Sequence, residues 1–294
     1  MTLLKVIIRK MLNNRWLTGS LFLGMVITVA LVSSIPTYTS SIMQKLLVKE
    51  LEDYQIEQHE FPGGFTFSDT FSIANVPNPG GALDELEQIK DSVVKDIGLP
   101  VVSSLSVIET IPLRMMYAEE ERRTSSLQPG KLLTVSGLEE HITITDGRPP
   151  SKKAVDGVWE ALVSEHALQK REIVLNTDFI VGEGENQFLV RPVGTFQVKS
   201  SQEPYLNILQ TNFSDDFIVN ESLFREELIA NYEHLLGIGR FSTAFDIYEL
   251  KEQHIPALLG LERSLTSQIS AVKNASLYVQ FPVESILRSY AKKR

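Results

Sequence analysis

The most extended apolar pattern of the chain lies near its N-terminus, where residues 16–44 contain no charged side chain. Within this stretch, residues 17–35 have the almost wholly apolar sequence LTGSLFLGMVITVALVSSI. Nineteen helical residues extend over ~28 Å, against ~30 Å for the hydrocarbon core of a bilayer. Trp16 and Tyr38 flank the run and belong to the residue types enriched at membrane interfaces. The pattern therefore predicts a transmembrane helix over 16–36.

Helical periodicity continues on both sides of the predicted span. Residues 1–15 place apolar side chains on one half of a helical wheel and basic ones on the other, which predicts an amphipathic helix on the cytosolic membrane surface. After Pro36, apolar residues again recur at helical spacing and predict a stalk helix over 37–60. The apolar positions of the stalk are Met43, Leu47, Leu51 and Tyr54.

Small residues recur every four positions inside the predicted span, at Ser20, Gly24 and Thr28. This spacing gives the helix one narrow side on which another helix can approach closely, so we expect a helix-packing face there. The same small residues also occur in helices that only anchor a protein. A cleaved signal peptide is an alternative for the whole segment, since a basic start, an apolar run and small residues at Ser33 and Ser34 fit that too.

The remainder of the chain alternates between strand-like and helix-like segments, which predicts an α+β fold. A turn-rich stretch from Pro62 to Gly81 opens a first α+β half over 61–150, with an amphipathic helix stopped by Gly98. The strands predicted after it are Val101–Ile111, Leu113–Tyr117, Leu132–Val135 and Ile142–Thr145.

A β-rich insertion is predicted over 151–212, followed by a second α+β half over 213–275 and a return segment toward the membrane over 276–294. In the insertion, EALVSEHAL fits a short strand followed by a short helix. The further strands predicted there are Phe179–Val181, Gln187–Val190 and Gly194–Val198. The second half is predicted as strand (Phe217–Val219), helix (Glu221–Leu236), strand (Phe241–Tyr248) and helix (Pro256–Ile269).

Charge divides the chain sharply. Residues 1–49 contain six basic and no acidic side chains, whereas the other 22 basic and 37 acidic residues give residues 50–294 a formal charge near −15. By the positive-inside rule, the basic N-terminus stays in the cytosol and the acidic body lies outside the cell membrane. An acidic body would repel nucleic acid, so we expect no nucleic-acid partner.

Motifs that carry chemistry are missing from the sequence. The chain has no Cys, and its five His are at least 20 residues apart, so no local metal-ligand set is formed. No GxSxG or P-loop motif occurs, and GIGRFS at 237–242 departs from the dinucleotide fingerprint at Ser242, so we expect a helix stop and turn there. Adjacent carboxylates such as Asp84 and Glu85 are typical of solvated helix faces. We expect a protein that is not an enzyme, with no catalytic residues, metal or cofactor.

Three segments carry a resemblance to a known family: DGRPPS at 146–151, EALVSEHALQKREIVLNTDFIV at 160–181, and FLVRPVGTFQV at 188–198. Together with the N-terminal span and stalk, they resemble the extracytoplasmic core domain of ABC transporter permeases of the FtsX-like and MacB-like type. Many relatives have Gly where this chain has Arg171 and Asn176. The resemblance implies porter-like α+β halves and a permease homodimer or paired permease driven by a separate cytosolic ABC ATPase.

Members of this family have four spans, three of them after the external domain, so this chain resembles a permease truncated before its second span. Apolar positions at Val283, Ile286, Leu287 and Tyr290 predict a helix that leads back to the bilayer. The expected function is that of a membrane subunit in an ABC-type export or mechanotransmission system. The alternative is a self-contained membrane-anchored binding or sensing protein, and a third possibility is a secreted protein cleaved near Ser34.

Overall fold

A computed structural model gives the fold of residues 15–58, 60–72, 79–119, 127–171, 173–184, 186–199, 216–229, 236–269 and 278–292. The chain divides into two compact units, Met1–Glu50 and Leu51–Arg294, which are described separately. The predicted amphipathic helix over 1–15 falls almost entirely outside the described residues.

The first described element is one long helix, α2 (Arg15–Gln58), without an internal break. Its first part, Arg15–Ile35, has a mean hydropathy of 1.9. The predicted span and the predicted stalk are therefore parts of a single α-helix.

Residues 51–294 form a mixed α+β domain around one curled sheet of twelve described strands. The order is β12-β1-β11-β2-β5-β10-β7-β9-β8-β3-β4, and β6 pairs with β9. Two neighbouring pairs are parallel, β5 with β10 and β7 with β9, and the other pairs are antiparallel. The strands are β1 (Gly64–Ser72), β2 (Val101–Thr110), β3 (Leu113–Tyr117), β4 (Leu127–Gly130), β5 (Leu132–Val135), β6 (Ile142–Gly147), β7 (Val158–Ser164), β8 (Phe179–Glu183), β9 (Asn186–Val198), β10 (Phe217–Val219), β11 (Leu236–Phe245) and β12 (Tyr278–Gln280).

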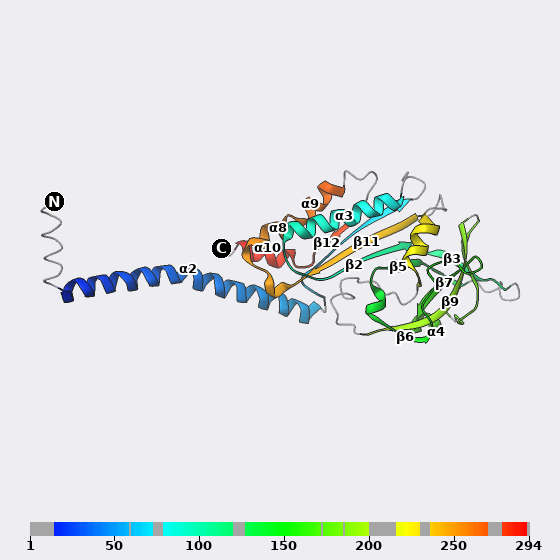
Figure 1. Cartoon of the computed structure of the whole chain (residues 1–294), viewed down its shortest axis with the longest axis horizontal. Helices are drawn as coiled ribbons and strands as arrows, with labels where there is room; N and C mark the ends of the chain where they lie inside the picture. The colour runs from blue at the N-terminus through cyan, green and yellow to red at the C-terminus, as the bar shows by residue number, and fades with distance from the viewer. Residues whose placement is uncertain are drawn as a thin grey trace. The chain divides into compact units, whose positions relative to one another are not determined.

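Helices cover one face of the strands β1, β11 and β2 (Figure 1). They are α3 (Pro79–Ile97), α8 (Ile255–Leu259) and α9 (Leu261–Ile269), with α10 (Glu284–Lys292) packed on α8. Aromatic side chains from β1 and β11 stack in pairs within this part of the sheet: Phe67 with Phe241 at 5.1 Å between ring centroids, and Phe65 with Phe245 at 5.8 Å. Burial of these large apolar side chains is the main force that holds helices and sheet together.

The other end of the sheet holds β6, β7, β8 and β9, with the short helix α4 (Glu165–Lys170) beside them (Figure 1). Ser164 caps α4, because its hydroxyl accepts a hydrogen bond from the N–H of Ala167. A cluster of buried apolar residues connects β2 and β5 with β6, β7, β9 and β10; it contains Leu105, Val107, Leu133, Val135, Leu138, Ile142, Leu162, Phe196 and Ile218.

Several predicted elements are confirmed. Strands occur at the predicted positions in β2, β3, β5, β6, β8 and β10, and the strand followed by a short helix is present as β7 and α4. The amphipathic helix of the first half is α3, and the helix predicted from Val283, Ile286, Leu287 and Tyr290 is α10.

Other predictions are wrong in whole or in part. GIGRFS is not a turn after a helix but part of β11. The helix expected over 221–236 is confirmed over 221–229, as α6 (Glu221–Leu223) continued by a π-helical turn, η4 (Phe224–Leu228), whereas 230–235 lie outside the described residues and Leu236 begins β11. The helix expected over 256–269 is divided into α8 and α9 at Gly260, whose N–H donates to the carbonyls of Pro256 and Ala257. The two strands expected over 187–198 form a single strand, β9.

Strands from the three predicted parts of the body belong to the same sheet. In the register of the sheet, β1 of the first half pairs with β11 of the second, and β3 of the first half pairs with β8 of the insertion. The division at 150 and 212 stays a prediction, while the mixed α+β class is confirmed.

Candidate functional site

The first candidate site is the apolar part of α2, which contains the predicted packing face. No residue of the most apolar window in Arg15–Ile35 is buried within the protein, which fits a membrane span and a signal sequence alike. The hydroxyl of Ser20 donates to the carbonyl of Leu17 at 3.0 Å, and that of Thr28 donates to the carbonyl of Gly24 at 2.8 Å. Both polar side chains are therefore satisfied within their own helix, as an apolar environment requires.

Gly24 leaves open space on this helix, because a Cβ placed there would meet no other atom within 4 Å. Ser20, Gly24 and Thr28 are spaced by four residues and therefore share one side of the helix. The structure thus places the three predicted residues on one narrow side of α2, and the packing of another helix there stays a prediction.

The second candidate site is the place where the three segments of the family resemblance meet. Arg148 lies in the turn after β6 and holds the buried carboxylate of Glu160 in β7 with both arms of its guanidinium: Nη1 to Oε2 is 2.7 Å, and Nη2 donates to Oε1. The backbone N–H of Ser151 donates to the same carboxylate at 3.0 Å. These hydrogen bonds, above all those from Arg148, hold the pKa of Glu160 below its usual range.

The third segment, in β9, packs directly on this turn. A Cβ on Gly194 would lie 2.5 Å from the carbonyl oxygen of Arg148, so only glycine lets the two backbones approach. Gly147 adopts a φ of +74°, which turns the chain back from β6. Arg191 of β9 forms a second pair with Asp178, with Nε to Oδ1 at 2.6 Å. The quoted segments therefore form one interlocked structural unit.

Arg171 and Asn176, the two positions at which this chain departs from the pattern of the family it resembles, have different backbone conformations. Asn176 has a φ of +61°, in the left-handed region that Gly and Asn tolerate best, and its N–H donates to the carbonyl of Pro192. Arg171 has a φ of −102°, which any residue can adopt. Asn176 therefore adopts a left-handed turn conformation without a Gly at this position.

Arg171 belongs to a group of charges inside the sheet that sequence reasoning missed. Glu109 in β2 is only 1% exposed, and its Oε1 accepts from Lys131 Nζ and Arg240 Nη2, each at 3.1 Å. Asp216 accepts from the backbone N–H of Lys131, and burial raises the pKa of its carboxyl group. The only sequence signal for this group was a Glu at the end of an apolar strand.

The guanidinium of Arg171 is buried close to this group, with 8% of the residue exposed. Its Nη1 donates to the carbonyl of Gln128 at 2.9 Å, while Nε has no acceptor in the described part of the chain. The group links β2, β4, β5 and β11 through hydrogen bonds, and its geometry fits a structural role in the sheet.

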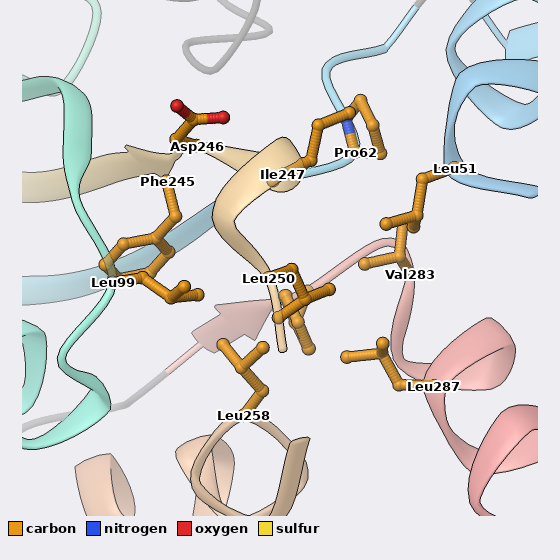
Figure 2. Close-up of a pocket in the computed structure, with 12 residues that line it drawn as sticks. Leu51, Pro62, Leu99, Phe245, Asp246, Ile247, Leu250, Leu258, Val283 and Leu287 are labelled. Atoms are coloured by element: carbon orange, nitrogen blue, oxygen red, sulfur yellow. The ribbon is translucent and has the colours of Figure 1, made fainter. Parts of the chain in front are cut away.

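The third candidate site is a small apolar cavity within residues 51–294 (Figure 2). Its volume is about 20 Å³, roughly the space of one water molecule. Leu51 at the end of α2, Leu258 of α8 and Leu287 of α10 point toward one another there, whereas the carboxylate of Asp246 points away (Figure 2). A cavity of this size and lining offers no group for catalysis and no room for a cofactor.

The residues considered for chemistry are distributed over several elements. Gly237 and Gly239 belong to β11, Asp84 and Glu85 lie on α3, and Glu226 and Glu227 lie in η4. Asp215, His59 and His234 fall outside the described residues. Among the residues that are described, no three His, Asp or Glu side chains are grouped so that they could hold a metal ion.

Comparisons with known proteins add little to this geometry. No protein-family model matches the chain, and no curated protein matches its sequence. Among solved structures, a domain of a protein from Porphyromonas gingivalis that is provisionally described as a permease is similar to this chain, with 12% identity and a TM-score of 0.33. The similarity covers 74% of this chain and 88% of that domain.

Proposed function

We propose that this chain is the N-terminal portion of a permease, the membrane subunit of an ABC-type export or mechanotransmission system. In this proposal α2 crosses the cell membrane once, its N-terminus lies in the cytosol, and the α+β domain acts outside the membrane. A separate cytosolic ABC ATPase supplies the energy, and the chain itself is not an enzyme. The external domain consists of porter-like halves that contact the substrate or an external partner.

The observation that carries the proposal is the continuity of α2. One helix without a break includes both the apolar stretch Arg15–Ile35 and the residues Leu51–Gln58 of the domain. A continuous helix is much stiffer than a flexible linker, so a displacement at one end is transmitted to the other. A protein that is only tethered to the membrane has no need for such a connection.

The interlocked segments around Arg148 and Glu160 support the same proposal. They are the segments on which the resemblance to FtsX-like and MacB-like permeases depends, and their contacts hold this part of the domain together. A rigid external domain is suited to transmitting force and to shaping a contact surface.

The encoding DNA provides the first test. A permease predicts three further apolar segments downstream of the codon for Arg294 and a neighbouring gene for a P-loop ATPase. A stop codon directly after Arg294, with no such neighbour, would support the alternative of a self-contained membrane-anchored binding or sensing protein.

A second test uses the packing face in the span. The full chain is purified from membranes, and Gly24→Leu is compared with wild type for co-purification of partner spans, either a second permease copy or a paired permease. Because a side chain at Gly24 meets no atom of its own protein, the substitution should leave the chain folded and weaken only the association. Unchanged association would contradict this packing face.

Carbonate washing of the same membranes, with sequencing of the N-terminus, distinguishes a retained span from a signal peptide cleaved near Ser34.

A further inference from the structure

One row of apolar side chains crosses the strands β3, β8, β9 and β7. Met116 of β3 pairs with Ile180 of β8, and Ile180 pairs with Leu189 of β9. Leu189 pairs in turn with Val158 of β7. The row ends at Val155, whose backbone N–H and carbonyl both bond to Val158, each at 2.9 Å. Residues that pair directly across strands share a face of the sheet, so these five side chains lie in line on one face.

This apolar row lies on the outer face of the strands. The neighbouring positions, which point to the other face, belong to the core and are at most 8% exposed: Tyr117, Phe179, Val190 and Trp159. In the row, by contrast, Leu189 and Val155 are 39% and 41% exposed, and Met116 and Ile180 are partly exposed. An antiparallel sheet with one face in the core normally has polar residues on the other. A continuous apolar row on the outer face therefore indicates contact with another molecule.

Charged side chains border the row on both sides. Two residues further along the strands, Arg191 pairs with Asp178, with Nε to Oδ1 at 2.6 Å, and Glu160 is held by the turn before β7. On the opposite border, Arg114 lies 3.5 Å from Glu183. An apolar centre with a polar rim is the usual composition of a protein–protein contact surface. These rim charges are already neutralised within the domain.

Two lysines near one end of the row have no such partner. Lys152 and Lys153 precede Val155 by three and two residues and are exposed, and their ammonium groups form no ion pair with any described residue. Asp156, on the other side of Val155, interacts electrostatically with Arg191 instead. Residues 50–294 carry a formal charge near −15, so two unpaired cations beside an apolar row stand out from the rest of the domain. They favour a partner with carboxylates at the corresponding end.

The turn that carries the two lysines is fixed before any partner binds. The N–H of Ser151 donates to the carboxylate of Glu160 at 3.0 Å, and the N–H of Lys153 donates to Oγ of Ser151 at 3.3 Å. Asp156 and Gly157 adopt φ values of +53° and +76°, as in the two-residue type I′ turn of a hairpin. A surface that is already ordered loses little conformational entropy on binding.

We infer that the row from Met116 to Val155 binds an amphipathic α-helix of another protein, with carboxylates at the end beside Lys152 and Lys153. Four inter-strand spacings of ~4.8 Å give the row a length of ~19 Å, equal to ~13 helical residues. The helical pitch of ~5.4 Å is close to the strand spacing, so each turn of such a helix places an apolar side chain over about one strand.

The charge of the domain favours a helix over a lipid surface. An anionic bilayer would face the acidic domain as a whole and be repelled by it, whereas a helix contacts only the row and the two lysines. The inference does not depend on the proposed function, since the surface is the same in a permease and in a self-contained binding protein.

The test uses the full chain in phosphatidylcholine nanodiscs and two synthetic probes. The acidic probe is a fluorescein-labelled helical peptide of about 14 residues, with a Leu on one side of each turn and three Glu in its first turn. The basic probe has Lys in place of these Glu. Fluorescence anisotropy should show at least fivefold tighter binding of the acidic probe at low ionic strength, and a smaller difference in high salt.

Variants of the chain locate the binding. Leu189→Asp places a charge in the centre of the row and should weaken binding of the acidic probe at least tenfold. Val102→Asp is the matched control, because Val102 is 51% exposed in β2 and lies outside the row, so binding should not change. The double variant Lys152→Glu with Lys153→Glu should reverse the preference, so that the basic probe binds more tightly than the acidic one. This variant keeps the test decisive if Leu189→Asp does not fold, since both lysines are exposed.

Three results with the probes would overturn the inference: no binding of the acidic probe up to about 1 mM, equal binding of the two probes, or binding that Leu189→Asp leaves unchanged. Self-association of the full chain that Leu189→Asp abolishes would assign the row to a second copy. Flotation of the nanodiscs with phosphatidylglycerol vesicles, lost in the same variant, would assign the row to lipid. Either result would overturn the inference as well, because the occupant would not be a helix of another protein.

Discussion

Arg148 and Glu160, twelve residues apart in sequence, form a two-armed ion pair that closes the turn between β6 and β7. Nη1 of the guanidinium lies 2.7 Å from Oε2 of the carboxylate, and Nη2 donates to Oε1. The side chain of Glu160 is almost fully buried, while that of Arg148 is more than half exposed. A carboxylate placed in the centre of the apolar strand VWEALVS is thereby neutralised, and the turn is fixed on β7.

Removal of Arg148 should destabilise the domain. Arg148→Ala leaves the buried carboxylate of Glu160 with one backbone donor, which we expect to lower the denaturant concentration at the midpoint of unfolding, though by less than for a fully buried pair because the guanidinium is exposed. The measurement is denaturant unfolding of the full chain, followed by the fluorescence of the buried Trp159. Arg114→Ala, which removes an exposed pair with Glu183, is the control and should change stability little. Equal losses in the two variants would contradict this role of Arg148.

The ion pair of Arg148 and Glu160 predicts that the stability of the protein depends on pH. Because the pKa of Glu160 is lower in the folded state than its unfolded value of ~4.3, ionised Glu160 stabilises the protein at neutral pH. This contribution is complete above the unfolded pKa and is lost as the pH falls through the folded pKa. Glu160→Gln should therefore flatten the decrease of stability below about pH 4. If the stability of Glu160→Gln fell with decreasing pH in the same way as that of the wild type, another carboxylate would cause the loss of stability in acid.

Removal of a hydroxyl group should affect stability differently at two neighbouring residues of β11, Ser242 and Thr243. Thr243 is fully buried and its Oγ1 has no hydrogen-bond partner among the residues that the structure describes, whereas Oγ of Ser242 lies 2.8 Å from Oγ1 of Thr66. Thr243→Val should leave stability unchanged or raise it by up to about 1 kcal/mol, because a buried unsatisfied hydroxyl is replaced by a methyl group of similar size. Ser242→Ala should lower stability by about 1 kcal/mol through loss of its hydrogen bond. Thermal unfolding measures the stability of both variants. If Thr243→Val lowered stability more than Ser242→Ala, the hydroxyl of Thr243 would not be an unsatisfied group.

Sequence patterns predicted the local elements well and the long-range contacts poorly. β2 was recognised because its ten residues combine β-branched and apolar side chains, and α3 because its apolar residues recur at helical spacing. β11 was missed at GIGRFS, since two glycines are typical of a turn. In the sheet, Gly239 instead allows α3 to approach, because a Cβ there would lie 3.1 Å from Cδ2 of Leu83.

β9 was divided in the prediction because Pro192 and Gly194 normally interrupt a strand. The sheet accommodates both residues at a shift in the register between β7 and β9. Ala161 of β7 pairs with Pro192 and Leu162 pairs with Gly194, so the residue of β9 between them has no partner in β7. The pairing of Arg148 with Glu160 and the charges around Glu109 depend on which strands become neighbours. Spacing along the chain contains no information about which strands become neighbours. It does predict that Ser20, Gly24 and Thr28 share one side of α2, because this is determined by a single helix, and the packing of another helix on that side stays a prediction.

Filling the cavity between α2, α8 and α10 should stabilise the domain. The cavity of about 20 Å³ has room for one additional methyl or methylene group, and Val283 lines it (Figure 2). Val283→Ile should raise the free energy of unfolding by about 0.5 to 1 kcal/mol, while Val283→Ala enlarges the cavity and should lower it by about 2 kcal/mol. Unfolding measurements on both variants test the cavity, and a loss of stability in both would show that the site is already filled.

A charge in the middle of the predicted span tests the membrane assignment of α2. Val26 lies near the centre of Arg15–Ile35, and on insertion scales an Arg at such a position costs ~2.5 to 3.5 kcal/mol. Val26→Arg should therefore reduce the fraction of the chain retained in carbonate-washed membranes. Val26→Leu is the control, since it keeps the apolar character and should be retained like the wild type. If the two variants fractionated alike, Arg15–Ile35 would not cross the membrane, because a bilayer discriminates strongly between Arg and Leu at its centre whereas an exposed helix in water does not.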